Sequence, residues 1–203
     1  MDSKYHLVKE EIFTNLLKSA LIDQEKCRGI IAGQITNLIK IAQRCIQTWH
    51  NGGKIIACGN GGSSGDAQHL ASELLNKYKH DRVALAAMAI TSDAQVITSI
   101  ANDRNYLEIF SRQLQGLLQA QDTLIVFTTS GNSSNIIEAV NTAKNKGVNT
   151  IAFTGFDGGK IAKTLSETDI ELRIAINNTA RVQEMHLTCI HLLCEYMDYC
   201  YSK

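Results

Sequence analysis

The sequence predicts an α/β fold, a three-layer, doubly wound sheet of five parallel strands that is preceded by two helices. From residue 54 on, short apolar runs alternate with segments of helical periodicity, which is typical of a parallel sheet with helices on both faces. The first fifty residues carry apolar side chains at helical spacing only. The chain has 203 residues, no proline and no low-complexity run, so we expect a single domain over residues 1–203.

Residues 1–50 predict two helices that cover the sheet or form a contact between subunits, and residues 51–203 predict the α/β core. We expect the helices to divide near Asp23 and the second to end at the "HNGGK" of residues 50–54. The apolar positions that carry this prediction are Leu7, Ile12, Phe13, Leu16, Leu17, Ile31, Ile35, Leu38, Ile41, Ala42 and Cys45.

Five apolar runs predict the strands. They are "KIIACG" at 54–59, "VALAAMAIT" at 83–91, "TLIVFTTS" at 123–130, "NTIAFTG" at 149–155 and "DIELRIAI" at 169–176. Helices are expected between them, with a long helix from about Thr179 onward. If the strand order is 2-1-3-4-5, strands one and three are neighbours where the order reverses, and open parallel sheets bind ligands at that point.

Composition argues for a small ligand rather than a nucleic acid or a membrane. Twenty basic residues balance twenty acidic ones, so the chain has no net positive charge that would attract a polyanion. Six cysteines show no CxxC spacing and lie in apolar stretches, which indicates reduced core residues of a cytoplasmic protein. The start, "MDSKYHLVKEEIF", lacks the apolar run of a signal peptide, and no stretch approaches the roughly 20 apolar residues that span a bilayer.

Two Gly/Ser loops follow strands one and three, in "CGNGGSSGDA" and "FTTSGNSSNI". Each precedes a helix N-terminus, where free amides and the helix dipole favour an anion. The first is a near miss for the dinucleotide fingerprint, with Ser64 in place of the third glycine, and it lacks the lysine of an ATP-binding loop. The second offers hydroxyls and amides without a fixed positive charge, which suits a phosphate monoester, although such loops are often simple turns.

His69 and Glu73 stand four residues apart on the helix after the first loop. Both therefore lie on one face and can share a metal or a substrate; the alternative is a partly buried histidine paired with a surface glutamate. The mainly apolar C-terminal helix contains "RVQEMHLTCIH", with Gln183, Glu184, His186 and His191. Buried polar groups need partners, but helical geometry alone does not say which histidine faces the crevice.

Together, "CGNGGSSGDAQHLASEL", "IAND", "TTSGNSSNI", "TGFDGGK" and "RVQEMHLTCIH" resemble the sugar isomerase (SIS) domain family over nearly the whole chain, and within it the phosphoheptose isomerases. The resemblance implies a flavodoxin-like SIS fold and a homotetramer. It also implies conversion of sedoheptulose 7-phosphate to D-glycero-D-manno-heptose 7-phosphate through an enediolate, on the route to ADP-heptose and lipopolysaccharide core. No membrane and no direct nucleic-acid partner are implied.

The same resemblance assigns roles to residues. Glu73 and His191 would be the catalytic pair: Glu73 would take a proton from carbon, and His191 would shuttle protons among oxygens. One zinc ion per subunit would be held by His69, Glu73, Gln183 and His191. Substrate contacts would come from Asn60, Gly61, Gly62, Ser63, Glu73, Asn102, Asp103, Thr128, Thr129, Ser130, Ser133 and Gln183.

Two positions depart from the isomerase pattern. Ala180 stands where the isomerases usually have an aspartate, and Thr128 stands where they usually have a serine. The forms "ARVQEMH" and "IANDR" are similar to a replication-initiation cofactor of the same family, a tetramer that binds the bacterial initiator protein. That relative lacks the acid at the position of Glu73, so the presence of all four implied zinc ligands favours the enzyme. A module that senses sugar phosphates would need a DNA-binding domain, for which 203 residues leave no room.

Overall fold

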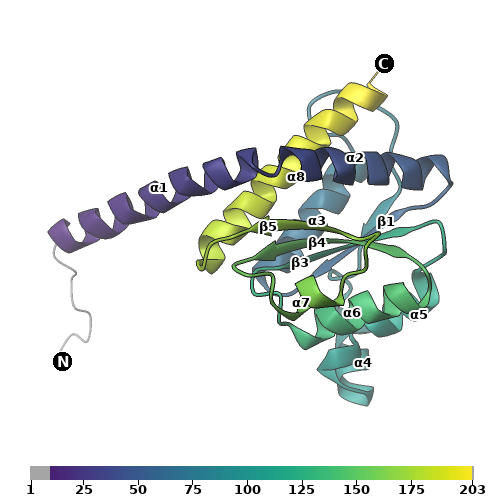
Figure 1. Cartoon of the computed structure of the whole chain (residues 1–203). Coiled ribbons are helices and arrows are strands. Elements are labelled where there is room, and N and C mark those ends of the chain that lie inside the picture. The colour runs from purple at the N-terminus through teal and green to yellow at the C-terminus, as the bar shows by residue number, and fades with distance from the viewer. Residues whose placement is uncertain (1–9, 203) are drawn as a thin grey trace.

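Five parallel strands form one sheet in the order β2-β1-β3-β4-β5 (Figure 1). This computed structural model of the chain describes residues 10–202. The strands are β1 (Ile55–Gly59), β2 (Ala87–Ala89), β3 (Thr123–Thr128), β4 (Asn149–Gly155) and β5 (Ile170–Ile174). The predicted fold class and strand order are confirmed.

Helices cover both faces of the sheet. One layer contains α1 (Glu10–Ala32), α2 (Ile35–His50), α3 (Gly62–Leu75) and α8 (Thr179–Tyr201). The other contains α5 (Ser111–Leu117), α6 (Ser134–Asn145) and α7 (Gly159–Thr164), while α4 (Ala94–Asp103) and the short η1 (Tyr106–Glu108) connect β2 to α5 (Figure 1). None of the helices between residues 10 and 202 combines the length and apolarity that crossing a membrane requires.

Alternation along the strands builds a separate core on each face. In β3, Ile125 and Phe127 pack with α3 and α8, whereas Leu124 and Val126 pack with α5 and α6. Successive side chains of a strand point to opposite faces, so a strand buried on both sides is apolar throughout. This explains why the strands are continuous apolar runs in the sequence.

The N-terminal helices divide later than predicted. Helix α1 continues past Asp23 to Ala32, and the break falls at Gly33 and Gln34. The Asp23 carboxylate lies 3.6 Å from the Lys26 ammonium one turn on, so a helix accommodates it, whereas glycine costs about 1 kcal/mol in a helix relative to alanine. The predicted break near Asp23 is therefore wrong. Leu7, which contributed to that prediction, lies outside the described residues.

Strand β2 is much shorter than its apolar run. Only Ala87–Ala89 pair with β1, and Val83 stays 55% exposed. The residues before β2 have other partners: Leu85 N donates to Leu74 O at the end of α3 (3.0 Å), and the Arg82 side chain is buried against the same helix end. Their hydrogen bonds to α3 keep them out of the sheet.

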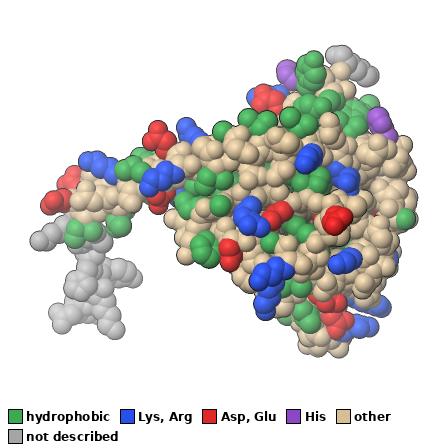
Figure 2. Space-filling model, in the orientation of Figure 1, with side chains coloured by type: hydrophobic (Ala, Val, Ile, Leu, Met, Phe, Trp, Pro, Cys, Tyr) green, Lys and Arg blue, Asp and Glu red, His purple; other side chains and the backbone are tan. Residues whose placement is uncertain are grey.

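The first half of α1 extends beyond the body of the molecule (Figure 1). From about its middle onward α1 packs on α8: Arg181 Nη1 donates to Ala20 O at 3.2 Å, and Cys27 and Ile31 are buried. Six large apolar side chains between residues 12 and 22 of α1 are exposed by half or more, and hydrophobic side chains run along this arm in Figure 2. They are Ile12, Phe13, Leu16, Leu17, Leu21 and Ile22.

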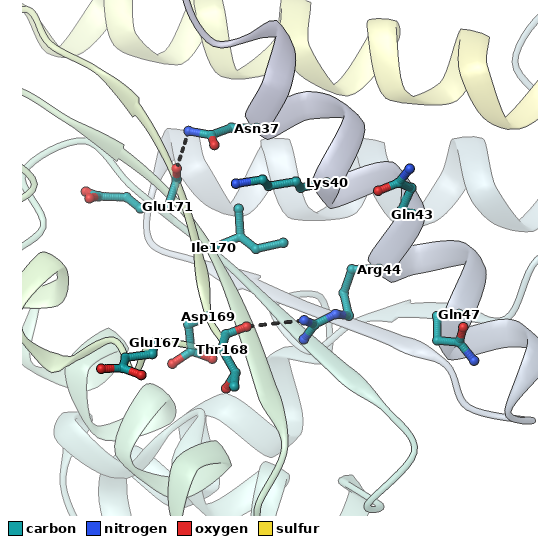
Figure 3. Close-up of a pocket in the computed structure, with 10 residues that line it drawn as sticks. All are labelled: Asn37, Lys40, Gln43, Arg44, Gln47, Glu167, Thr168, Asp169, Ile170 and Glu171. Carbon is teal, nitrogen blue, oxygen red and sulfur yellow. Dashed lines mark hydrogen bonds between the residues drawn. The ribbon is translucent and has the colours of Figure 1, made fainter.

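Helix α2 covers the open edge of the sheet along β5 (Figure 3). Asn37 Nδ2 donates to Glu171 O and Arg44 Nη2 to Thr168 O, each at 3.2 Å, so these carbonyls are not free to pair with another chain. A polar hollow of about 540 Å³ remains between α2 and residues 167–171 (Figure 3). It lies at the amino end of β5, opposite to the two Gly/Ser loops, and contains none of the predicted site residues.

Candidate active site

The loops after β1 and β3 meet at the carboxyl ends of these neighbouring strands, as the strand order requires. Asn60 in the first loop and Asn135 in the first turn of α6 exchange two side-chain hydrogen bonds of 2.8 Å. Tyr106 of η1 donates its hydroxyl to Asn60 Oδ1 at 3.1 Å. The sequence analysis missed Asn135 and Tyr106, because their roles depend on contacts between distant segments.

A cavity of about 210 Å³ lies between the two loops and the start of α8. It is lined by Asn60, Ser63, Phe127, Thr128, Thr129, Ser130, Ser133, Thr179 and Gln183. Seven of these nine are predicted substrate contacts; Phe127 and Thr179 are additional. The lining offers hydroxyls and amides and no charged side chain, beside the N-termini of α3 and α6. Neutral donors at helix N-termini suit a phosphate group.

Glycines give the second loop its shape. Gly131 has a φ of 64°, and a Cβ added there would stand 2.0 Å from Gly158 O. The "TGFDGGK" loop after β4 packs directly on this point: Ile161 N donates to Gly131 O at 3.0 Å, and Lys160 N donates to Asn132 Oδ1 at 3.1 Å. A side chain at Gly131 would push these two loops apart.

The two departures from the isomerase pattern have different settings. The Thr128 hydroxyl accepts a hydrogen bond from Gly131 N at 3.2 Å, which closes the loop, and a serine hydroxyl has the same capacity. Ala180 is exposed in the first turn of α8 and brings no polar group to the cavity.

His69, Glu73 and His191 come together between α3 and α8. His69 Nε2 lies 3.0 Å from His191 Nε2 and 3.4 Å from Glu73 Oε1. The Tyr78 ring stacks on the His191 ring, with centroids 5.3 Å apart and planes inclined by 22°. Burial lowers the pKa of His191, and nearby His69 lowers it further, against an opposing effect of Glu73. The neutral imidazole, which can accept a proton or bind a metal, is therefore favoured.

The structure decides between the two histidines of α8. His186 is fully buried, its Nε2 lies 3.1 Å from Thr154 O, and its ring packs against Phe127 and Phe153. Burial lowers the pKa of His186 to about 4, so it is a neutral core residue at physiological pH. His191 is the histidine that faces α3.

Gln183 stands apart from the three clustered side chains. It precedes His191 by two helical turns, about 12 Å along the axis, and an added Cβ at Gly62 would meet its amide nitrogen at 2.3 Å.

Two imidazoles and a carboxylate are donor types that zinc favours. In residues 10–202, however, no three donors are arranged as a metal-binding group. The two imidazole nitrogens stand at hydrogen-bonding distance, closer than the about 3.3 Å between two ligands of a tetrahedral zinc.

The other predicted contacts do not line the cavity. Gly61 and Gly62 begin α3, where Gly61 has a φ of 53°. Asn102 and Asp103 end α4 on the surface, joined by a 2.9 Å hydrogen bond between their side chains.

Asp66, which the sequence analysis passed over, is buried on α3 three residues before His69. Its Oδ2 has no hydrogen-bond partner, and burial raises the pKa of Asp66 to about 6.

Comparison with known proteins identifies the family. Residues 24–155 match the SIS domain family. The chain is 47% identical over 157 residues to the phosphoheptose isomerase of Chromohalobacter salexigens, and 49% identical over 159 residues to that of Alteromonas mediterranea. These alignments cover 77% and 78% of this chain and 80% of each relative.

The fold comparison agrees. The structure of a phosphoheptose isomerase from Neisseria gonorrhoeae superposes with a TM-score of 0.86 at 38% identity, covering 92% of this chain and 99% of that one. One from Francisella tularensis superposes with a TM-score of 0.86 at 34% identity, covering 92% and 98%. The chain therefore belongs to the SIS domain family and, within it, to the phosphoheptose isomerases.

Proposed function

We propose that this chain is an aldose-ketose isomerase that converts sedoheptulose 7-phosphate to D-glycero-D-manno-heptose 7-phosphate. The observation that carries the proposal is the combination of a carboxylate-imidazole cluster between α3 and α8 and a neutral, donor-lined cavity at the loops after β1 and β3. The named relatives support the substrate assignment. The cavity would hold the phosphate, and the cluster would act on the carbonyl end of the open-chain sugar.

Glu73 and His191 would carry the proton transfers. Glu73 takes a proton from C1 of the ketose, which gives an enediolate, and the same group returns a proton to C2. His191, favoured in its neutral form, moves the O1 proton to O2, so that the product is an aldose with no net change in atoms. When bound, a zinc ion would supply positive charge for the developing oxyanion. His69, Glu73 and His191 would hold it, with Gln183 as the implied fourth ligand.

The metal proposal predicts a loss of zinc when one imidazole is removed. Wild-type protein should bind one divalent ion per chain, and His69→Ala should bind at least about tenfold less tightly, because one of the few donors is lost. Elemental analysis after equilibration with limiting zinc measures this. His50→Ala, at the exposed end of α2, is the matched control. Equal zinc content in wild type and His69→Ala would leave His69 as an ordinary histidine of the helix interface.

The exposed arm of α1 supports a homotetramer. Its six large apolar side chains are 50–63% exposed, and a second apolar surface lies between α2 and α8, where Ile35, Ile39 and Leu192 are 43–55% exposed. We expect light scattering at micromolar concentration to give the mass of about four chains, the number that the family resemblance implies; burial of this apolar surface, at about 25 cal/mol per Å², would stabilise the assembly. Leu16→Asp together with Leu17→Asp should dissociate the assembly. A stable wild-type monomer would contradict the proposal.

We also place the protein in the cytoplasm. All six cysteines are free, five of them buried, which supports a reducing compartment. The alternative function, a tetramer that binds the replication initiator, gains no support from the site, because that role does not need the clustered Glu73, His69 and His191.

The direct test is incubation with sedoheptulose 7-phosphate while aldose formation is followed. Unphosphorylated sedoheptulose is the control substrate and should react far more slowly, because it cannot use the donors of the loop cavity. Absence of aldose with the phosphorylated sugar, together with capture of the initiator protein in a pull-down, would favour the alternative.

A further inference from the structure

A buried ion pair joins the end of α3 to α8, outside the cavity and the His-Glu cluster. Arg82 Nε donates to Asp198 Oδ1 at 2.9 Å, with side-chain exposures of 0% and 2%. Asp198 Oδ2 accepts two further hydrogen bonds, from the backbone amides of Lys79 (2.6 Å) and His80 (2.8 Å). Burial alone would raise the pKa of Asp198, but these amides and Arg82 bring it below its usual value. The carboxylate is therefore ionised and fully bonded.

The Arg82 guanidinium also caps α3 at the turn that carries Glu73. Its Nη2 donates to Glu73 O at 2.6 Å, and its Nη1 donates to Leu74 O at 2.9 Å. The last carbonyls of a helix lack partners within the helix, so these bonds fix where its last turn lies. Arg82 thereby ties the backbone of Glu73 directly to Asp198 on α8.

The same segment reaches the other member of the proposed proton-transfer pair. Tyr78, one residue before the first amide that binds Asp198, stacks on the His191 ring. Asp198 itself follows His191 by seven residues, so the two lie on nearly the same face of α8. Residues 76–82, which we term the bracket, thus contact Glu73 through Arg82 and His191 through Tyr78.

We propose that Arg82 and Asp198 are positioning residues for the isomerisation, holding Glu73 and His191 at a fixed separation through the bracket. The proposal rests on the proposed function of that pair. Both side chains are buried and neither lines the cavity, so their effect would pass through the helix end and the tyrosine ring. Misplacing reacting groups by about 1 Å can cost a hundredfold in rate, so a loosened bracket should lower kcat more than it weakens binding.

The chain supplies a matched control in a second buried carboxylate. Asp122 also accepts bonds from two backbone amides, those of Lys54 (2.9 Å) and Gln119 (2.9 Å), and from one cation, Lys54 Nζ (2.6 Å). Its side chain is 1% exposed. It directly precedes β3, at the amino end of the sheet, and none of its hydrogen bonds goes to a residue of the cavity or of the cluster. Asp122→Asn and Asp198→Asn therefore remove the same chemistry, but only Asp198 is bonded to the segment that contacts Glu73 and His191.

The experiment compares kcat, KM and the melting temperature of wild type, Asp198→Asn and Asp122→Asn. Both variants should melt lower than wild type. Only Asp198→Asn should lose kcat, by about tenfold to a hundredfold, with KM within about twofold of wild type. If Asp198→Asn does not fold, Arg82→Lys replaces it: lysine keeps the charge but cannot bridge Asp198 and both carbonyls, so the same loss of kcat is expected.

Equal kcat values in the two variants, or a loss confined to melting temperature, would overturn the positioning role and leave the ion pair as a purely structural element. A wild-type protein without isomerase activity is a different outcome, because it refutes the proposed function itself. The two failures are thus told apart by the wild-type rate in the same experiment.

Discussion

Replacing Glu73 with glutamine is expected to lower kcat by about a hundredfold to ten-thousandfold, the usual loss when a general base is removed. Glutamine keeps the size of the side chain and one oxygen, but it cannot take a proton from C1. The affinity for sedoheptulose 7-phosphate should change little, because Glu73 does not line the loop cavity that would hold the phosphate. Steady-state kinetics give kcat, and calorimetric titration of the variant gives the dissociation constant.

A control for Glu73→Gln is Glu138→Gln, which removes a half-buried carboxylate from α6 outside the cavity and the cluster. It should retain wild-type kcat. If Glu73→Gln also isomerises within a few-fold of wild type, Glu73 is only a partner for His69, and the initiator-binding alternative gains most of the weight.

Gly131→Ala is expected to raise the dissociation constant for sedoheptulose 7-phosphate by about a hundredfold. The left-handed φ of 64° is strained for alanine, and the new Cβ would stand 2.0 Å from the Gly158 carbonyl, so the loop must move. A hundredfold loss corresponds to about two hydrogen bonds to a charged group. Calorimetric titration of the folded variant with the phosphorylated sugar measures the change.

Gly116→Ala is the matched control for Gly131→Ala. A Cβ at Gly116, inside α5, meets nothing within 4 Å. This substitution should leave binding unchanged and raise stability by about 0.5 to 1 kcal/mol, the usual gain of alanine over glycine in a helix. Wild-type affinity in Gly131→Ala would show that the second loop does not hold the phosphate.

Most of the fold could be predicted because its signals are local. Strand β4 has the bounds of its apolar run, residues 149–155, since both faces of a central strand are buried. The break between α1 and α2 was misplaced because Asp23 and Gly33 are both weak helix formers, and which of them interrupts the helix depends on packing against α8. Strand β2 was predicted too long because the partners of Arg82 and Leu85 are not visible in the sequence around them.

The site divides in the same way. The position of the second loop at the crevice could be predicted from the sequence. It follows from the Gly/Ser turn residues and from the rule that parallel sheets bind ligands where the strand order reverses. The choice of His191 over His186 depends on which face of α8 meets α3, a tertiary fact. The contact between Arg82 and Asp198 joins residues 116 positions apart, so no spacing in the sequence points to it.

Proton transfer between C1 and C2 is tested most directly by NMR of sedoheptulose 7-phosphate incubated with the wild-type protein in deuterium oxide. In an enediolate route Glu73 carries the proton taken from C1, and because its side chain is 20% exposed, that proton can exchange with solvent before it is returned to C2. The expected product is therefore D-glycero-D-manno-heptose 7-phosphate that carries deuterium at C2. Failure to form any aldose, with the protein folded and supplied with zinc, would contradict the assignment of this chain as an isomerase of that sugar.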